Sequence, residues 1–239
     1  MASNKFMMIY NDLSKKIQHN KYQIGSCLPS ENDLAINYGV SRETIRKALN
    51  YLSQNGYIQK IRGKGSVVLD AGRYDFPVSG LVSFKEVAKR SGKTWSTCVH
   101  ELTLIQPSDE IKDKLRITDK TYVWKIVRSR IVDGETIILD KDYINQDIIP
   151  TLTKETCEDS LYQFIEEDCD LMISFARKEF SVDPITNEDK IYMTLKNDQQ
   201  VVVVKSQVFL DDARLFQYTE SRHRLDKFRF IDFARREHQ

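Results

Sequence analysis

Six basic side chains fall between residues 41 and 68 of a chain whose net charge is only +1. They are Arg42, Arg46, Lys47, Lys60, Arg62 and Lys64. Cations at this density suit the phosphates of a nucleic-acid duplex, and an Arg side chain can also donate two hydrogen bonds to guanine. Residues 1–70 carry ten Lys and Arg against five Asp and Glu, whereas residues 71–239 carry 26 against 30. This asymmetry predicts that the N-terminal part meets a polyanion.

Two further arginines, Arg128 and Arg130, lie two residues apart in a segment that predicts a strand over residues 122–130. Because side chains two apart in a strand share a face, both guanidinium groups lie on a face that is otherwise apolar. Buried guanidinium groups need anionic partners. The partner could be Asp140 or Glu220, or the phosphate of a ligand, which Arg binds through bidentate hydrogen bonds. The residues alone leave a structural salt-bridge network and a phosphate site equally open.

Helical patterns in residues 1–70 position the first group of cations. Apolar residues between Phe6 and Ile17 recur at helical spacing and make one apolar face. Ser30 fits the N-cap of a second helix, where backbone N–H groups could hold a phosphate, and Gly39 fits the end of that helix. Ser41 then fits the N-cap of a third helix after a short turn.

The third helix and the basic segment after it complete a DNA-binding motif. An apolar face from Ile45 to Leu52 leaves the N-terminal end of this helix in solvent. Residues 57–61 and 66–69 predict two strands joined by a glycine-rich turn. Three helices and a hairpin predict a winged helix-turn-helix, whose third helix reaches base edges in the major groove. The predicted DNA-binding residues are Ser30, Ser41, Arg42, Thr44, Arg46, Arg62, Lys64 and Gly65.

The second half of the chain predicts a sheet with short helices. Residues 133–134, Asp-Gly, are typical of a hairpin turn, and the return strand after them carries Asp140. Two more strands, each about 4–8 residues long, flank the turn at residues 211–212. Alternation over residues 228–232, with Phe228 and Phe230 on one side, predicts a short last strand. Helices followed by strands in two domains make the predicted fold class α+β.

Several chemistries lack their motifs in this sequence. The four cysteines are scattered, without a C-x-x-C pair or zinc-ligand spacing, so we expect free thiols and no metal. We find no P-loop and no nucleophile elbow, and therefore expect no catalytic residue, no cofactor and no enzyme activity. No apolar run approaches the ~20 residues of a membrane span, and the N-terminus lacks the layout of a secretory signal. We expect a cytoplasmic protein without a membrane partner.

The phrases LPSE, YGVSRETIRKAL, NGYI and RGKGSVV together resemble the N-terminal domain of the GntR family of bacterial transcription regulators. The family often has an Arg where this chain has Asn32, so one phosphate contact common in relatives is in question here. The segments FPVSGLVSFKE, RSRIVDGE, ILDKDYI, EDSLYQFIEE and FQYTESRHRLDKFRFIDFARR resemble the effector-binding domain of the HutC branch. The resemblance covers nearly the full chain.

This resemblance implies an architecture and a set of partners. It implies a winged helix-turn-helix at residues 1–70, a linker at 71–77, and a chorismate-lyase-like effector-binding and dimerisation domain with a mainly antiparallel sheet at 78–239. It also implies a homodimer that binds palindromic operator DNA and represses a sugar-utilisation operon. The phrases are close to those of trehalose-operon repressors, which implies trehalose 6-phosphate as the inducer.

Carried over by position, the resemblance further implies an effector site. Ser83, Arg128, Arg130 and Ser160 would hold the phosphate, and Phe84, Asp140, Tyr162 and Glu220 would face the sugar. Three alternatives stay open. The chain could be a regulator of the same family that responds to another sugar phosphate, a sugar-phosphate enzyme fused to a DNA-binding head, or a DNA architectural factor without a ligand.

Overall fold

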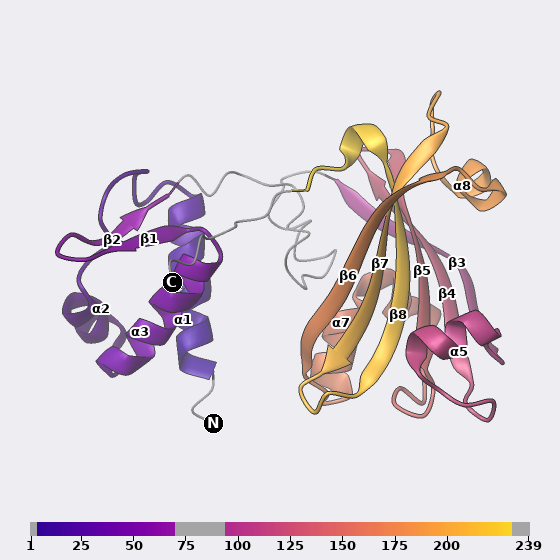
Figure 1. Cartoon of the computed structure of the whole chain (residues 1–239), viewed down its shortest axis with the longest axis horizontal. Helices are drawn as coiled ribbons and strands as arrows, with labels where there is room; N and C mark the ends of the chain where they lie inside the picture. Colours follow the sequence, from indigo (N-terminus) through magenta and orange to yellow (C-terminus); the bar gives the residue numbers. More distant parts are fainter. Residues whose placement is uncertain (1–3, 70–93, 231–239) are drawn as a thin grey trace, which may run out of the picture. The chain divides into compact units, whose positions relative to one another are not determined.

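The computed structural model describes residues 4–69 and 94–230 (Figure 1). The chain divides into two compact units, whose described residues are these two ranges. The linker predicted at 71–77 and the last residues of the chain lie outside the described residues. The exact domain boundaries therefore stay a prediction.

The N-terminal unit has the predicted order of three helices and a hairpin. Its elements are α1 (Asn4–Gln18), α2 (Glu31–Tyr38), α3 (Arg42–Gln54), β1 (Ile58–Ile61) and β2 (Gly65–Val68). The three helices share one core, in which Leu13, Leu34, Ile45 and Leu52 are almost completely buried. The apolar spacing that predicted these helices therefore marks the side chains that pack together.

Capping residues begin and end the helices at the positions that the sequence predicts. Ser30 and Asp33 form a reciprocal capping box at the start of α2. Gly39 ends α2 with a φ of 62°, a left-handed conformation that glycine adopts at little cost. The Ser41 hydroxyl accepts a hydrogen bond from the Thr44 N–H at 3.3 Å and caps α3. These caps fix where α3 begins.

The C-terminal unit contains a six-stranded sheet, and every neighbouring pair of strands is antiparallel. The strands are β3 (Trp95–Ile105), β4 (Val123–Val132), β5 (Glu135–Asn145), β6 (Ile173–Pro184), β7 (Gln200–Leu210) and β8 (Leu215–Arg224). Their order is β3-β4-β5-β8-β7-β6, which Figure 1 shows from right to left. The prediction of a mainly antiparallel sheet is confirmed.

Helices cover both faces of this sheet. They are α5 (Asp109–Leu115), α6 (Lys154–Asp159), α7 (Leu161–Gln163), the π-helical turn η1 (Phe164–Asp168), α8 (Asn187–Tyr192) and the 3₁₀ turn η2 (Leu225–Lys227). We call the face that packs against α6, α7 and η1 the inner face, where Ile126 and Val208 meet Leu161. We call the other the outer face, where α5 packs on Tyr218 and the residues after α8 pack on Val127.

Three details of the predicted sheet are wrong. The strand predicted over residues 122–130 begins at Val123 instead, and Tyr122 just before it is 48% exposed. The strands beside residues 211–212 have 11 and 10 residues rather than about 4–8. Phe228 and Phe230 form no strand: their rings lie near Phe180, so their alternation reflects ring packing rather than strand pairing. Asp232, the last residue of that predicted strand, lies outside the described residues.

All four cysteines are free, as predicted. Cys27 and Cys98 are exposed, Cys157 is buried and Cys169 is half-buried. No helix among the described residues has both the length and the hydrophobicity to cross a membrane. Within residues 4–69 and 94–230, no cluster of His, Cys, Asp and Glu side chains has the arrangement of a metal site.

Candidate functional site

The start of α3 gathers four of the predicted DNA-binding residues. Ser41, Arg42 and Arg46 are exposed there, and Thr44 is half-buried beside the Ser41 cap. Arg46 donates to the Glu31 carboxylate at 3.2 Å, across the turn between α2 and α3. An exposed pair of this kind contributes no more than about 1 kcal/mol, so a phosphate or a base edge can replace Glu31.

The first turn of α2 satisfies part of its own hydrogen-bonding capacity. The Ser30 N–H donates to the Asp33 carboxylate at 3.3 Å, and the Asp33 N–H donates to the Ser30 hydroxyl at 3.2 Å. Glu31 and Asp33 add two negative charges to the same turn. The predicted phosphate contact at Ser30 therefore has fewer free donors than an open helix start would offer.

The tip of the hairpin presents two cations to solvent. Arg62 and Lys64 are exposed and have no ion-pair partner among the described residues. Gly63 and Gly65 flank Lys64 with φ angles of 80° and 102°, values that side-chain-bearing residues rarely adopt. Lys60, one of the six basic side chains but not one of the predicted DNA contacts, donates from its ammonium group to Asn50 at 2.6 Å and joins the hairpin to α3.

The inner face of the sheet buries the first of the two predicted arginines. Arg128 is 4% exposed and donates through Nε and Nη2 to Asp142 Oδ2, at 3.2 and 2.6 Å. Its Nη1 donates to the Cys157 carbonyl at 3.2 Å. Asp142 was not predicted, although it lies two residues after Asp140 on the same strand and so on the same face.

Arg130 forms a second buried ion pair beside the first. Its Nε donates to Asp140 Oδ2 at 2.8 Å and its Nη1 donates to the Thr97 hydroxyl at 2.8 Å. The Ser221 hydroxyl donates to the other Asp140 oxygen. Burial acts to raise the pKa of Asp140, but Arg130, Arg128 and Ser221 outweigh it, so this pKa is lowered and the carboxylate stays ionised.

Two predicted residues, Ser160 and Tyr162, lie at the start of α7, which covers this face. Ser160 caps α7, and its hydroxyl accepts from the Gln163 N–H at 3.4 Å. Burial raises the pKa of Tyr162, and the charges of Asp142, Arg128 and Asp140 also influence it. Tyr162 therefore lies within electrostatic reach of the cluster. Ser83 and Phe84, two further predicted effector residues, lie outside the described residues.

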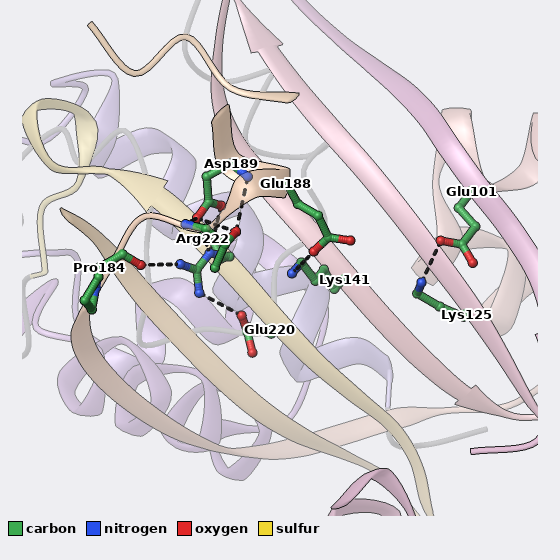
Figure 2. A network of polar contacts seen from close by, with 9 residues as sticks. Glu101, Lys125, Lys141, Pro184, Glu188, Asp189, Glu220 and Arg222 are labelled. Atoms are coloured by element: carbon green, nitrogen blue, oxygen red, sulfur yellow. Dashed lines mark hydrogen bonds and ion pairs between the residues drawn. The ribbon is translucent and has the colours of Figure 1, made fainter. Parts of the chain in front are cut away.

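Glu220 does not join the arginine cluster, contrary to the grouping predicted from the sequence. It pairs across the strands with Lys141, whereas its neighbour Ser221 pairs with Asp140. Successive side chains point to opposite faces, so Glu220 lies on the outer face. There its carboxylate accepts from Arg222 Nη1 at 2.9 Å, as Figure 2 shows.

The outer face carries its own charged network. Arg222 also donates through Nε to Asp189 at 2.8 and 3.0 Å, which fixes α8 to the sheet (Figure 2). A groove of about 470 Å³ lies farther along this face, between α5 and strands β6, β7 and β8. This groove is separate from the arginine cluster, because the sheet lies between them.

Comparisons with known proteins agree with the structures of both units. Residues 7–68 match the model of bacterial regulatory proteins of the gntR family, and residues 90–229 match the UTRA domain. The chain is 53% identical over 236 residues to the HTH-type transcriptional regulator TreR of Bacillus subtilis, and the alignment covers 99% of both chains. The chain belongs to the GntR family.

Solved structures extend this assignment. The effector-binding domain of the B. subtilis trehalose repressor is 50% identical, with a TM-score of 0.55, and the match covers 60% of this chain and 99% of that one. The possible regulator YydK of B. subtilis, at 24% identity, supports the fold, with a TM-score of 0.79 and coverage of 97% and 99%. This GntR protein is thus a DNA-binding transcription regulator with a small-molecule effector domain, and not an enzyme.

Proposed function

We propose that the chain is a cytoplasmic repressor of a trehalose-utilisation operon and that trehalose 6-phosphate releases it from DNA. The observation that carries this proposal is the 53% identity to TreR over nearly the full length. The solved relative at 50% identity is the effector-binding domain of a trehalose repressor, which supports the same sugar. The paired arginines of the inner face supply cations for the phosphate.

Binding of the phosphate requires an exchange of partners, because Arg128 and Arg130 already hold Asp142 and Asp140. A phosphate dianion between two guanidinium groups replaces each carboxylate with a more highly charged, bidentate partner. Asp140 is then released to accept hydrogen bonds from sugar hydroxyls. The salt-bridge network and the phosphate site, two alternatives at the sequence level, become two states of one cluster in this proposal.

The proposed working form is a homodimer that binds a palindromic operator. Support comes from β6, an edge strand of 12 residues that exposes Phe175 and Val182 at 48% and 55%. A long edge strand with exposed apolar side chains is a site for pairing with another chain. We expect sedimentation equilibrium to give a dimer, and Val182→Lys to shift it toward monomer. A monomeric wild-type protein would contradict the proposed dimer.

A thermal-shift experiment tests the effector. A ligand at 100 times its dissociation constant stabilises the native state by about 2.7 kcal/mol. We expect trehalose 6-phosphate to raise the unfolding midpoint, and trehalose without the phosphate to leave it unchanged. Arg128→Lys keeps the charge but loses the bidentate geometry, so it should abolish the shift. A shift with unphosphorylated trehalose alone would overturn the proposed role of the arginines.

A further inference from the structure

Three polar groups on the inner face lack hydrogen-bond partners among the described residues. The Gln217 Oε1 atom is fully buried without a donor. The hydroxyls of Ser206 and Thr219 also have no partner there, but their oxygens are not fully buried, so both are open to water or a ligand. Ser206 and Thr219 face each other across β7 and β8, and Gln217 lies two residues before Thr219 on the same face. The unsatisfied groups therefore form one patch.

Such a patch calls for a partner from outside the fold. A buried polar atom without a partner loses its bonds to water without gaining others, and native proteins rarely contain one; Gln217 Oε1 is such an atom. The neighbouring Asp142, Asp140 and Ser221 are all hydrogen-bonded within the chain. The contrast between a satisfied cluster and an unsatisfied patch beside it indicates that the patch is completed by a ligand.

The position of the patch relates it to the arginine cluster. Thr219 pairs with Asp142, the carboxylate that holds Arg128, and Ser206 lies one strand farther on. Adjacent strands are about 4.8 Å apart, so Ser206 on β7 lies about 14 Å from Arg128 on β4. A single hexose held by its phosphate at the arginines is too short to span this distance, whereas a second ring extends toward Thr219 and Ser206.

We propose that Thr219 and Ser206 form a subsite for the second sugar ring of a disaccharide phosphate. The inference rests on the proposed function, since it takes the arginine cluster as the phosphate site. Serine and threonine hydroxyls both donate and accept, which suits sugar hydroxyls. Val204 and Val208 flank Ser206 on the same face but are 6% and 0% exposed, so the hydroxyls supply the contacts to the ring. The subsite thereby selects two rings over one.

The test compares two ligands that share a phosphate. In the full chain, Ser206→Ala with Thr219→Val removes both hydroxyls and preserves side-chain volume. Calorimetric titration should show trehalose 6-phosphate binding about 10- to 100-fold more weakly, because two hydrogen bonds are lost. Binding of glucose 6-phosphate should change less than twofold. Ser181→Ala removes a hydroxyl from the outer face of β6 and should change neither affinity.

Each outcome decides between the subsite and its rivals. If the double variant binds trehalose 6-phosphate as tightly as the wild type, the subsite is wrong while the proposed effector stands. Equal weakening for both ligands also overturns the subsite, since it points to a general disturbance of the face. If the wild-type protein binds glucose 6-phosphate but not trehalose 6-phosphate, both the effector and the subsite are wrong.

Discussion

Two arginines at the start of α3 differ in how they are held before DNA arrives. Arg46 pairs with Glu31, whereas Arg42 has no ion-pair partner among the described residues and lies in the first turn of the helix. The first turn of a recognition helix is the part that reaches base edges. Arg42 is therefore the residue best placed to contact base edges. Arg46 can contact DNA only after its ion pair with Glu31 breaks.

We expect Arg42→Ala to weaken binding to the specific operator by about 1–3 kcal/mol. Binding to random duplex should weaken much less, because one phosphate contact carries little sequence information. Fluorescence anisotropy at fixed salt measures both affinities. Lys120→Ala, an exposed cation of the effector unit, serves as the control and should change neither. Equal losses on specific and random DNA would make Arg42 a phosphate contact.

A second residue, His223, predicts a pH dependence of stability. Burial lowers its pKa to about 4, with Lys178 acting in the same direction and Asp140 against it. In the unfolded chain a His titrates near pH 6.5. Between these values the unfolded state binds more protons, so the free energy of unfolding falls as the pH drops from about 6.5 to about 4 and then levels off.

Replacing His223 by Gln should remove this contribution. Thermal unfolding midpoints measured between pH 4 and 7.5 should then fall less steeply for the variant than for the wild type. The buried Asp140 titrates in both proteins, so the difference between the two curves isolates the histidine. Parallel curves would show that His223 takes up its proton equally in both states.

At the residue scale, sequence periodicity predicted part of the arginine cluster. Arg128, Arg130 and Asp140 lie together because their spacing along two strands places them on one face. Thr97 and Ser221 were missed, since the register between strands far apart in the chain decides which residues meet. The same register separates Glu220 from Asp140.

At the element scale, α8 shows how a short helix of six residues is held in place (Figure 2). Asp189 is fully buried, bonds Arg222, and also caps the helix through the Thr186 N–H at 2.6 Å. The adjacent Glu188 pairs with Lys141 but keeps 42% of its side chain exposed. Two carboxylates next to each other in sequence thus differ sharply in burial.

This difference predicts unequal costs of removal. Asp189→Ala leaves the buried Arg222 guanidinium without one of its two carboxylate partners. We expect it to lower the free energy of unfolding by about 3–5 kcal/mol. Glu188→Ala, the matched control, should cost no more than about 1 kcal/mol. Urea unfolding measures both. Similar costs for the two variants would mean that Glu220 and Pro184 alone satisfy Arg222.

Elements with local signals were predictable, and elements set by packing were not. The caps at Ser30 and Ser41 and the Asp-Gly turn at residues 133–134 act within a few residues, so the sequence alone revealed them. The segment after β8 follows Arg224, which bonds Asp226 and Glu135 as the chain turns through η2. No local sequence pattern predicts that turn, and the alternation of Phe228 and Phe230 after it resembles the pattern of a strand.

At the scale of the whole molecule, induction requires that binding of the effector weakens binding of the operator. The inducer must bind the DNA-incompetent arrangement better than the competent one. Coupling of this kind is typically about 1–3 kcal/mol, or roughly 5- to 150-fold in affinity. Since the arginine cluster lies in one compact unit and the cations of α3 in the other, the coupling has to pass between units.

Thermodynamic linkage makes this coupling testable from both ends. If trehalose 6-phosphate weakens operator binding by a given factor, operator DNA must weaken trehalose 6-phosphate binding by the same factor. We expect titrations of the free and the DNA-bound protein to give matching ratios within about 5–150-fold. Arg128→Lys should bring both ratios to one while operator affinity without effector stays at the wild-type value. An unequal pair of ratios would require a third component, such as a co-regulator, in the release of the repressor.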